Sequence, residues 1–251
     1  MHIKVNDLSK TYKVKKGKVK ALEEVSFSVP KGAFVSIVGP SGCGKSTLIK
    51  ILSGVVPRSG GQVLIGGRSV EGPQRDIGIV FQSPVLPPWR SVLNNVLLPI
   101  EVLRLDIVRY RARALELLKL VGLKGFEHSY PRELSGGMQQ RASICRALIH
   151  DPELLMMDEP FGALDALTRE QMGLELLSIW EKTEKTVLFI THSIEEAVFL
   201  SDEVIVMTPR PGRVIRAVEI ELSRPRTLKV KGTGQFNDYV LGIKSTMGFS
   251  L

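Results

Sequence analysis

One stretch of the sequence decides the fold: Gly39-Pro40-Ser41-Gly42-Cys43-Gly44-Lys45-Ser46-Thr47. A short apolar, β-rich run, Ala33–Val38, precedes it, and a helical pattern from Ser46 to Leu52 follows it. Glycines let the backbone wrap closely around a ligand so that successive N–H groups point inward, and the helix adds the positive end of its dipole. The stretch therefore predicts a loop that binds the phosphates of a nucleoside triphosphate.

Three side chains of this loop have expected roles. Lys45 supplies a cation to the β- and γ-phosphates, and the Ser46 hydroxyl is placed to bind Mg²⁺. Cys43 stands near a helix N-terminus, where it is either a reactive thiol or a small residue tolerated in the loop. The helix that follows has Gly54 as its expected C-cap.

Further apolar runs each end where a polar motif or a turn begins. Continuous apolar runs suit strands covered on both faces of a parallel sheet, and polar residues at their carboxyl ends suit ligand binding along one edge. The predicted strands are Ile77–Phe81, Leu154–Met157, Thr186–Ile190 and Glu203–Met207. Residues 1–30 and 61–67 alternate more like strands of a separate antiparallel sheet.

Helices are predicted between these strands. Residues 108–121 and 168–182 each show an amphipathic pattern. The apolar stripe of the first consists of Ala112, Leu115, Leu118 and Val121. The segment from about 85 to 150 has no convincing strand, which predicts a helical subdomain inserted between sheet strands. The expected fold class is α/β: a P-loop NTPase core with a parallel sheet flanked by helices, an antiparallel β subdomain and the inserted helical subdomain.

An acidic pair follows the predicted strand Leu154–Met157. Asp158 can hold Mg²⁺ through its water shell, and Glu159 can polarise the attacking water. Taken alone, two adjacent carboxylates are equally well a solvated strand end, but Mg²⁺ at the phosphate loop needs an acidic partner. His192 ends the next strand, and we expect it to hydrogen-bond a γ-phosphate oxygen, although a lone histidine is more often structural.

A second glycine motif is Leu134-Ser135-Gly136-Gly137-Met138-Gln139-Gln140-Arg141. Ser135 and the two glycines open a helix, where backbone N–H groups and a hydroxyl form an anion site. The alternative, a plain helix N-cap with a glycine turn, does not require the whole eight-residue pattern. The motif lies too far along the chain to extend the first loop. Two phosphate half-sites in one chain indicate that two copies complete each other's nucleotide pockets.

With these motifs in this order, the chain resembles the ATPase subunits of ABC transporters up to about residue 222. Gly39–Thr47 matches that family's Walker A loop, and Leu134–Arg141 matches its signature. The remaining matches are Asp158 and Glu159 to Walker B and its catalytic glutamate, His192 to the switch histidine, Gln82 to the glutamine that senses Mg²⁺ and the membrane partner, Ala163-Leu164-Asp165 to the loop that crosses the dimer interface, and Tyr12 to the aromatic that stacks on adenine.

The resemblance implies an ATPase that uses ATP and Mg²⁺. Glu159, His192 and Lys45 would be catalytic. The implied nucleotide contacts are Tyr12, all residues from Gly39 to Thr47, Gln82, Ser135, Gly136, Gly137 and Asp165, and the implied Mg²⁺ ligands are Ser46, Gln82 and Asp158. Two subunits would sandwich two ATP molecules, and closure of this sandwich would drive a membrane partner.

The segment Gln82–Val96, with Asp202-Glu203-Val204 and Met207–Arg213, is similar to the nitrate/sulfonate/taurine branch of bacterial importers. The implied cargo is a small anion such as a sulfonate, taurine or nitrate. The implied partners are a second copy or a homologous ATPase subunit, integral-membrane permease subunits and, indirectly, a solute-binding protein. We expect a peripheral protein at the cytoplasmic face of the membrane, with an ATPase domain over 1–222 (helical subdomain about 85–150) and a short C-terminal tail, 223–251.

Composition limits other classes. An apolar fraction of 43% with 24% charged residues is ordinary for a soluble globular chain, and no run reaches ~18 apolar residues, so no transmembrane span or signal peptide is expected. Two cysteines cannot form a disulfide framework and suit a reducing compartment. The net charge of +8 gathers at the lysines of residues 13–20 and in the tail from Arg210. It is either solvated charge or a contact for anionic lipid or an acidic partner; aromatics at only 6% argue against nucleic acid.

Three other functions compete with a transporter subunit. A non-transport ABC-type ATPase acting in DNA repair or on ribosomes usually carries a coiled-coil insertion or two tandem cassettes, and this chain has neither heptads nor room. A nucleotide kinase would not need Leu134–Arg141, and a purely regulatory nucleotide-binding module would not need Glu159.

Overall fold

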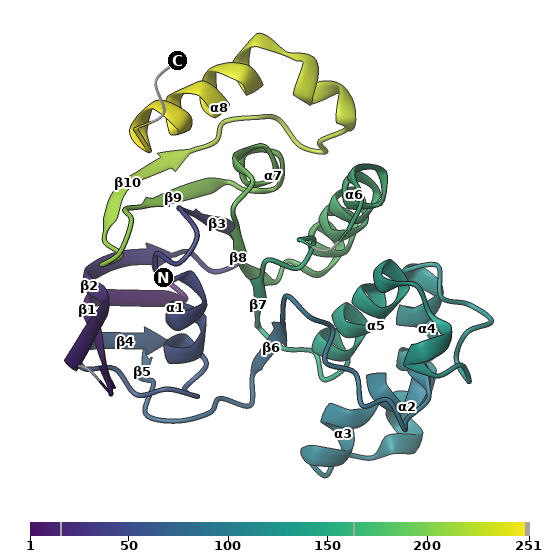
Figure 1. The fold of residues 1–251 in the computed structure, drawn as a ribbon. Helices are drawn as coiled ribbons and strands as arrows, with labels where there is room; N and C mark the ends of the chain where they lie inside the picture. Colours follow the sequence, from purple (N-terminus) through teal and green to yellow (C-terminus); the bar gives the residue numbers. More distant parts are fainter. Residues whose placement is uncertain (16, 163, 249–251) are drawn as a thin grey trace. The chain divides into compact units, whose positions relative to one another are not determined.

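The computed structural model describes residues 1–15, 17–162 and 164–248. They form two compact units, which are treated separately below: unit 1 is Met1–Gln74 with Leu176–Leu251, and unit 2 is Arg75–Glu175 (Figure 1). Strands and helices occur in both units, so the predicted α/β class is confirmed.

The first sheet of unit 1 is antiparallel, in the order β2-β1-β4-β5. Its strands are β1 (Ile3–Val14), β2 (Gly17–Val29), β4 (Gly60–Ile65) and β5 (Arg68–Ser69). Val5 pairs with Phe27 on one side and with Val63 on the other. Val5 and Val63 are buried, which explains the alternating pattern of residues 1–30 and 61–67.

The second sheet of unit 1 contains strands in the order β10-β9-β3-β8. Its strands are β3 (Phe34–Val38), β8 (Thr186–Thr191), β9 (Glu203–Met207) and β10 (Val214–Glu219). The first three are parallel to one another and almost wholly buried, as their continuous apolar runs predict. The edge strand β10 is antiparallel and largely exposed, so it lacks the apolar run that would have predicted it.

Helix α1 (Lys45–Leu52) has Ser53 as its C-cap, and Gly54, the predicted cap, follows it as the left-handed residue that ends the helix. The Gly54 N–H donates to the Ile51 carbonyl at 2.9 Å, and the Val55 N–H donates to the Lys50 carbonyl at 2.9 Å. This pair of bonds is a Schellman motif, which needs a left-handed residue. Gly54 has a φ of +75°, and a Cβ there would stand 1.9 Å from the Gly72 carbonyl oxygen. Only glycine fits this position.

Unit 2 contains two parallel strands, β6 (Ile77–Val80) and β7 (Leu154–Asp158). The elements between them are all helices: α2 (Val92–Val96), α3 (Leu98–Val102), α4 (Ile107–Leu120), the 3₁₀ turn η1 (Pro131–Glu133) and α5 (Gly136–Leu148). Helix α6 (Ala166–Thr183) begins in unit 2 and ends in unit 1.

The buried face of α4 differs from the predicted stripe. Leu118 and the following Val121 are buried as expected, but Ala112 and Leu115 are exposed and Ala114 is buried instead. Arg113 lies on the packed side, where its Nη2 donates to Asp151 at 2.9 Å and to the Leu148 carbonyl at 3.3 Å. An arginine can lie on a packed face when its guanidinium finds acceptors. The apolar stripe alone therefore predicted the wrong buried face for the first half of this helix.

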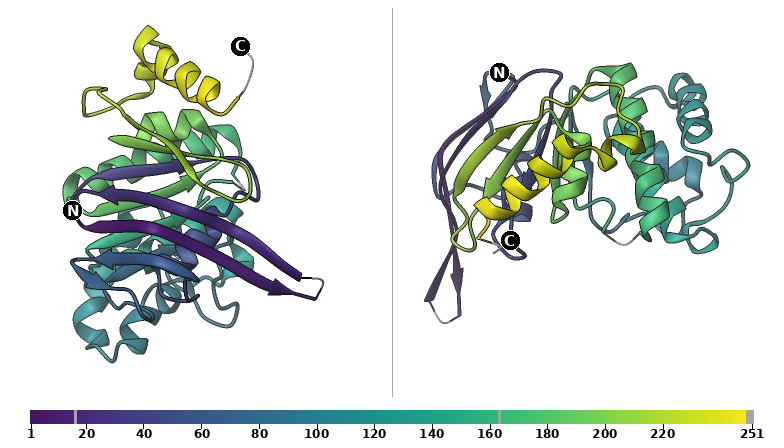
Figure 2. Two further views of the ribbon diagram at one scale, coloured as in Figure 1. Left: turned by 90° about the vertical axis from the view of Figure 1, so that its left-hand side faces the viewer. Right: turned by 90° about the horizontal axis from the view of Figure 1, so that it is seen from above.

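The C-terminal part of the described chain packs within unit 1. It contains η2 (Leu228–Gly232) and α8 (Gly234–Thr246), and α8 packs on α7 (Ile194–Leu200) and β10 (Figure 2). Arg226 joins this segment to α7. It is only 4% exposed, and its guanidinium donates to backbone carbonyls. The acceptors are Val198, Phe199, Ser201, Ile220 and Leu222.

Burial lowers the pKa of Arg226 to about 10, so the guanidinium is still protonated at neutral pH. We therefore expect Arg226→Met to lower the free energy of unfolding by about 3 kcal/mol, because it leaves several buried carbonyls without their donor. Lys229→Met, at an exposed position of η2, removes a charge nearby and should change stability by less than about 0.5 kcal/mol. Urea titrations of both variants measure the difference; equal midpoints would show that Arg226 does not hold the tail.

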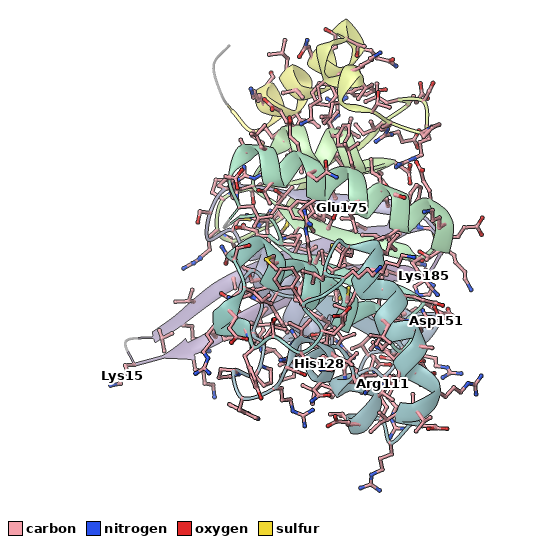
Figure 3. The ribbon with its side chains drawn as sticks, turned by 90° about the vertical axis from the view of Figure 1, so that its right-hand side faces the viewer. Lys15, Arg111, His128, Asp151, Glu175 and Lys185 are labelled. Carbon is pink, nitrogen blue, oxygen red and sulfur yellow. The ribbon has the colours of Figure 1, made fainter. Side chains whose placement is uncertain are left out.

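Lys13, Lys15, Lys18 and Lys20 lie on the β1–β2 hairpin, which extends beyond the neighbouring strands of its sheet, with Lys15 near its end (Figures 2 and 3). Lys13 pairs directly with Lys18, and both are exposed; Lys16 lies outside the described residues. Within the ranges described above, no helix is long and apolar enough to cross a bilayer.

Candidate functional site

The phosphate loop connects β3 to α1 in unit 1. The Lys45 side chain is only 5% exposed, and its ammonium donates to the Gly39 carbonyl at 2.8 Å and to the Pro40 carbonyl at 3.2 Å. These bonds fold the lysine along the inside of the loop, with its charge at the N-terminus of α1. A buried cation beside a helix N-terminus is suited to an anionic ligand.

The loop approaches its neighbours too closely for most side chains. Gly44 has a φ of +111°, and a Cβ there would lie 2.7 Å from Leu22 Cδ2 and 2.8 Å from the Ala21 carbonyl oxygen. A Cβ at Gly39 would lie 2.9 Å from Cys43 Sγ and 3.1 Å from Met207 Cβ. Cys43 is fully buried beside Gly39, so it fills space in the loop and is not an accessible thiol.

Two further predicted residues belong to unit 1. The Tyr12 hydroxyl lies 3.5 Å from Thr47 Oγ1, which places the half-buried ring beside the phosphate loop. His192 follows Thr191, and Thr191 pairs with Val38, the residue before the loop. The exposed histidine and the phosphate loop therefore leave neighbouring parallel strands at the same edge of the sheet.

The same arrangement of strand ends brings two predicted residues of unit 2 together. Val80 of β6 pairs with Met157 of β7, so Gln82 and Glu159 leave adjacent strands. Gln82 Nε2 donates to Glu159 Oε2 at 3.4 Å. Glu159 has a φ of +46°, an uncommon conformation for a non-glycine residue, and such strain is frequent where a side chain must point in a particular direction.

Ser135 is the N-cap of α5, and its hydroxyl accepts a hydrogen bond from the Met138 N–H at 3.3 Å. The capping interpretation of this serine is therefore part of the structure. Ser135 and Gly136 are exposed at the N-terminus of a 13-residue helix. Gly137 faces α6: a Cβ there would lie 3.2 Å from Thr168 Cγ2. An exposed helix N-terminus of this length remains a good phosphate half-site.

Asp165 lies beside this second motif, at the start of α6. It accepts hydrogen bonds from the Thr168 N–H at 3.0 Å and from the Thr168 hydroxyl at 2.6 Å. These bonds hold the pKa of Asp165 below its usual range, so it is ionised at neutral pH. Leu164 is buried, and the next residue, Asp165, is exposed. Ala163 lies outside the described residues.

The predicted metal ligands offer oxygen atoms in each unit: the exposed Ser46 hydroxyl in unit 1, and the Asp158 carboxylate and Gln82 amide in unit 2. Hydroxyl, carboxylate and amide oxygens suit a hard cation such as Mg²⁺, and a Mg²⁺ ion bound to nucleotide needs few protein ligands. Among the described residues no group of three or more His, Cys, Asp or Glu side chains forms a separate metal centre. The oxygen donors of each unit are thus of the kind that Mg²⁺ prefers.

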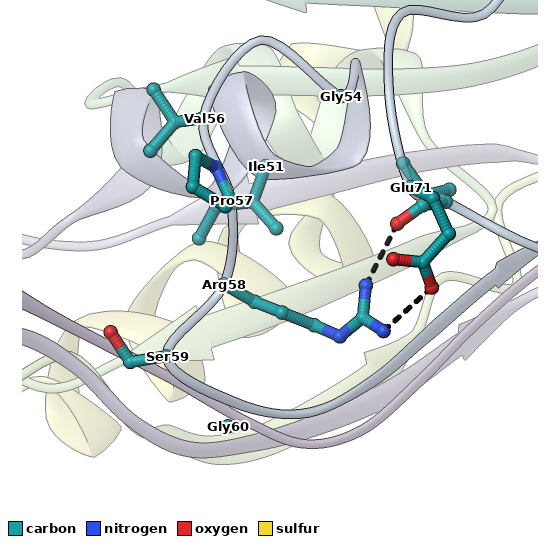
Figure 4. Close-up of a pocket in the computed structure, with 9 residues that line it drawn as sticks. Ile51, Gly54, Val56, Pro57, Arg58, Ser59, Gly60 and Glu71 are labelled. Atoms are coloured by element: carbon teal, nitrogen blue, oxygen red, sulfur yellow. Dashed lines mark hydrogen bonds and ion pairs between the residues drawn. The ribbon is translucent and has the colours of Figure 1, made fainter.

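A pocket of about 540 Å³ lies elsewhere in unit 1, near the C-terminus of α1 and β4 (Figure 4). Arg58 and Glu71 form an ion pair of 2.8 Å across it. None of the predicted site residues lines this pocket, which is open and held by its own polar contacts. The chemistry of the phosphate loop, not the size of this hollow, locates the nucleotide site.

One contact to the phosphate loop is not predicted by the sequence patterns. Arg210 Nε donates to the Gly42 carbonyl at 3.2 Å from the turn between β9 and β10. The turn itself is recognisable from Pro209-Arg210-Pro211-Gly212, but a separation of 168 residues gives no signal that it reaches the loop.

We expect Gly44→Ala to weaken ATP binding by at least about 100-fold, because the added methyl group meets Leu22 and the Ala21 carbonyl and displaces the loop. Gly66→Ala is the matched control: Gly66 also has a positive φ, of +55°, but no atom lies within 4 Å of its added Cβ. Titration calorimetry with ATP compares them. Wild-type affinity in Gly44→Ala would contradict the role of close packing.

Comparison with known proteins identifies the family of the chain. The family profile described as ABC transporter matches residues 22–162. The chain is 52% identical to the taurine import ATP-binding protein TauB of Rhizobium johnstonii, over 88% of this chain and 85% of that protein. It is 41% identical to the aliphatic sulfonates import ATP-binding protein SsuB of Bacillus thuringiensis subsp. konkukian, over 96% and 95%, and 49% identical to an uncharacterized ABC transporter ATP-binding protein of Methanocaldococcus jannaschii, over 89% and 84%.

Solved structures give the same assignment. A dimeric, post-hydrolysis ATP-binding cassette, MJ0796, bound to ADP and Pi matches with a TM-score of 0.78 and 34% identity, over 88% of this chain and 100% of that one. The cbiO1 subunit of the cbiONQ ABC transporter complex from Clostridium perfringens matches with a TM-score of 0.76 and 28% identity, over 88% and 89%. The chain therefore belongs to the ABC transporter family, as one of its ATP-binding and ATP-hydrolysing subunits.

Proposed function

We propose that this ATPase drives a bacterial-type importer for a small sulfonate, and that hydrolysis is coupled to transport through Gln82. The observation that carries the proposed coupling is the 3.4 Å contact between the Gln82 amide and the Glu159 carboxylate. Gln82 also opens the segment 82–96, whose Trp89 is 75% exposed and available to a partner. A shift of this segment would therefore move a neighbour of the catalytic carboxylate.

The catalytic roles follow from the chemistry of each side chain. Glu159 acts as the base that orients and deprotonates the attacking water, and His192 donates a hydrogen bond to a γ-phosphate oxygen. Lys45 compensates charge on the β- and γ-phosphates. Tyr12 lies against the adenine. Mg²⁺, held by Ser46, Gln82 and Asp158, would neutralise part of the phosphate charge.

The second phosphate half-site implies a dimer. We place Ser135, Gly136 and Gly137 of one subunit against the ATP held by the phosphate loop of the other, with Asp165 at the interface. The dimeric state of the related MJ0796 cassette supports this arrangement. The partner is a second copy or a homologous ATPase subunit, and Mg²⁺–ATP is enclosed between them.

The transported solute and the membrane partner follow from the relatives. TauB is a taurine import ATP-binding protein, and SsuB is an aliphatic sulfonates import ATP-binding protein. We assign this chain to the same class, at the cytoplasmic face of the membrane, bound to permease subunits that receive solute from a binding protein. In this assignment residues 1–222 form the ATPase domain, residues 85–150 its permease-facing helical part, and residues 223–251 a short tail.

Glu159→Gln tests the catalytic assignment. We expect it to bind Mg²⁺–ATP with near wild-type affinity, to lower kcat by about 10²–10⁴-fold because the general base is lost, and to accumulate as an ATP-bound dimer. Phosphate release and light scattering measure the two effects. Glu116→Gln, on an exposed face of α4, is the control and should hydrolyse normally. Normal turnover by Glu159→Gln would exclude this base.

Ser135 variants separate a phosphate contact from a helix cap. Ser135→Ala loses both the cap of α5, worth about 1 kcal/mol, and the hydroxyl. Ser135→Asp keeps a capping acceptor but places a negative charge toward the phosphates. If the serine serves ATP in the opposite subunit, Ser135→Asp hydrolyses more slowly than Ser135→Ala, while monomers of both still bind ATP. Recovery of activity in Ser135→Asp would mean that capping is the whole role.

Co-purification tests the transport assignment. A tagged chain, expressed in its own host, should retain a permease, and deletion of its gene should abolish growth on taurine or an alkanesulfonate as the sulfur source but not on sulfate. Growth on every sulfonate, with wild-type ATPase activity in vitro, would reject the sulfonate assignment and leave the ATPase assignment intact.

A further inference from the structure

The turn between β9 and β10, residues Thr208–Arg213, is anchored on strand β2. The Gly212 N–H donates to the Ala21 carbonyl at 3.0 Å, and the Glu23 N–H donates to the Gly212 carbonyl at 3.0 Å. Gly212 also forms a parallel bridge with Leu22. These bonds fix the 208–213 turn against the strand whose residues Ala21 and Leu22 already contact the phosphate loop at Gly44.

A side-chain contact strengthens this anchor. Glu23 Oε2 accepts from Arg213 Nε at 3.0 Å and lies 2.8 Å from Arg213 Nη2. Lys20 also lies 2.5 Å from Glu23 Oε1, and Lys20 and Arg213 together hold the pKa of Glu23 below its usual range. The turn is therefore tied to β2 through both backbone and side chains.

The opposite side of the 208–213 turn touches two successive carbonyls of the phosphate loop. Arg210 Nε donates to the Gly42 carbonyl at 3.2 Å. Gly212 lies so close to the Cys43 carbonyl that a Cβ would stand 2.1 Å from its oxygen. The turn thus holds one carbonyl by a charge-assisted hydrogen bond and the next by a close backbone approach.

Fixing these carbonyls also fixes the N–H groups of the loop. A trans peptide unit is planar, so its N–H points away from its C=O. With the Gly42 carbonyl turned toward the 208–213 turn, the Cys43 N–H donates to the Pro40 carbonyl at 3.3 Å and closes the loop. With the Cys43 carbonyl turned the same way, the Gly44 N–H points away from the turn. N–H groups that a closed loop presents on one side are the element that binds phosphate oxygens.

Burial alone does not explain Arg210. The residue is exposed, so it adds little to the core, and its hydrogen bond goes to a loop 168 residues away and not to its own turn. An exposed arginine that donates to a backbone carbonyl is useful where the direction of that carbonyl matters.

We propose that the 208–213 turn is a support for the phosphate loop and that Arg210 is a positioning residue for nucleotide binding, acting through the Gly42 carbonyl. The effect on nucleotide affinity rests on the proposed function of the loop. The effect on loop structure does not, because the buried Cys43 thiol reports it without any nucleotide.

The test uses the full chain with Cys145→Ala, which leaves Cys43 as the only thiol. In this background Arg210→Met should raise the rate at which a thiol reagent labels native Cys43 by about tenfold, since one charge-assisted hydrogen bond is lost. It should raise KM for ATP by a similar factor and leave kcat at saturating ATP within about twofold. Gly212→Ala should expose Cys43 more strongly, because its methyl group displaces the Cys43 carbonyl.

Three comparisons make the test decisive. Arg216→Met, which removes an exposed arginine on β10, should label like wild type. Arg210→Gln keeps a donor without the charge and should recover part of the affinity. If Arg210→Lys alone recovers affinity, and only at low salt, the residue attracts phosphates by charge and the positioning role is wrong.

If Arg210→Met and folded Gly212→Ala both label Cys43 at the wild-type rate, the 208–213 turn does not support the loop, whatever the ATP affinity. A wild-type chain that fails to bind ATP would instead refute the proposed function.

Discussion

The close approach of a glycine backbone to its surroundings is the constraint on which unit 1 depends. Gly44 lies against Ala21 and Leu22 of β2, and Gly39 lies against Met207 at the end of β9, at distances that leave no room for a Cβ. The phosphate loop is therefore supported by the antiparallel sheet at Gly44 and by the second sheet at Gly39. The antiparallel sheet is not an independent addition to the nucleotide-binding core, because the shape of the loop depends on where β2 lies.

Strand register accounts for the chemistry at the sheet edges. The carboxyl ends of parallel strands lie at the same edge of a sheet. The register of two neighbouring strands therefore determines which of the residues that follow them lie close together. The pairing of Val38 with Thr191 brings the phosphate loop and His192 to one edge of unit 1. The pairing in β6 and β7 does the same for Gln82 and Glu159 in unit 2. Each unit thus carries its own incomplete set of reactive groups.

The sequence predicts best what depends on local pattern. The buried parallel strands and the Gly54 cap follow from continuous apolar runs and from a left-handed turn, and both are confirmed. Strand β10 is not predicted because Arg216 interrupts its apolar residues and most of the strand faces solvent, so it has no continuous apolar run. The buried face of α4 is predicted wrongly because Arg113 donates to Leu148 and Asp151 on the packed side. These acceptors lie far from α4 in the sequence, so the periodicity of the helix does not reveal them. For the site, the motifs identify the residue types, while contacts such as that between Arg210 and Gly42 depend on long-range packing.

The arginines from residue 210 onward show why the net charge is a poor guide to partners. Arg226 is buried among backbone carbonyls, and Arg224 donates to Asp202 at 2.7 Å and stacks 4.1 Å from the Trp180 ring. Arg213 pairs with Glu23. A planar guanidinium with several donors can bind carbonyls that no other side chain could satisfy together, so Arg226 holds the fold together from inside, while Arg213 forms its ion pair at the surface. Part of the +8 charge is therefore structural, and the exposed lysines of the β1–β2 hairpin are a better candidate for an electrostatic surface than the buried arginines of the tail.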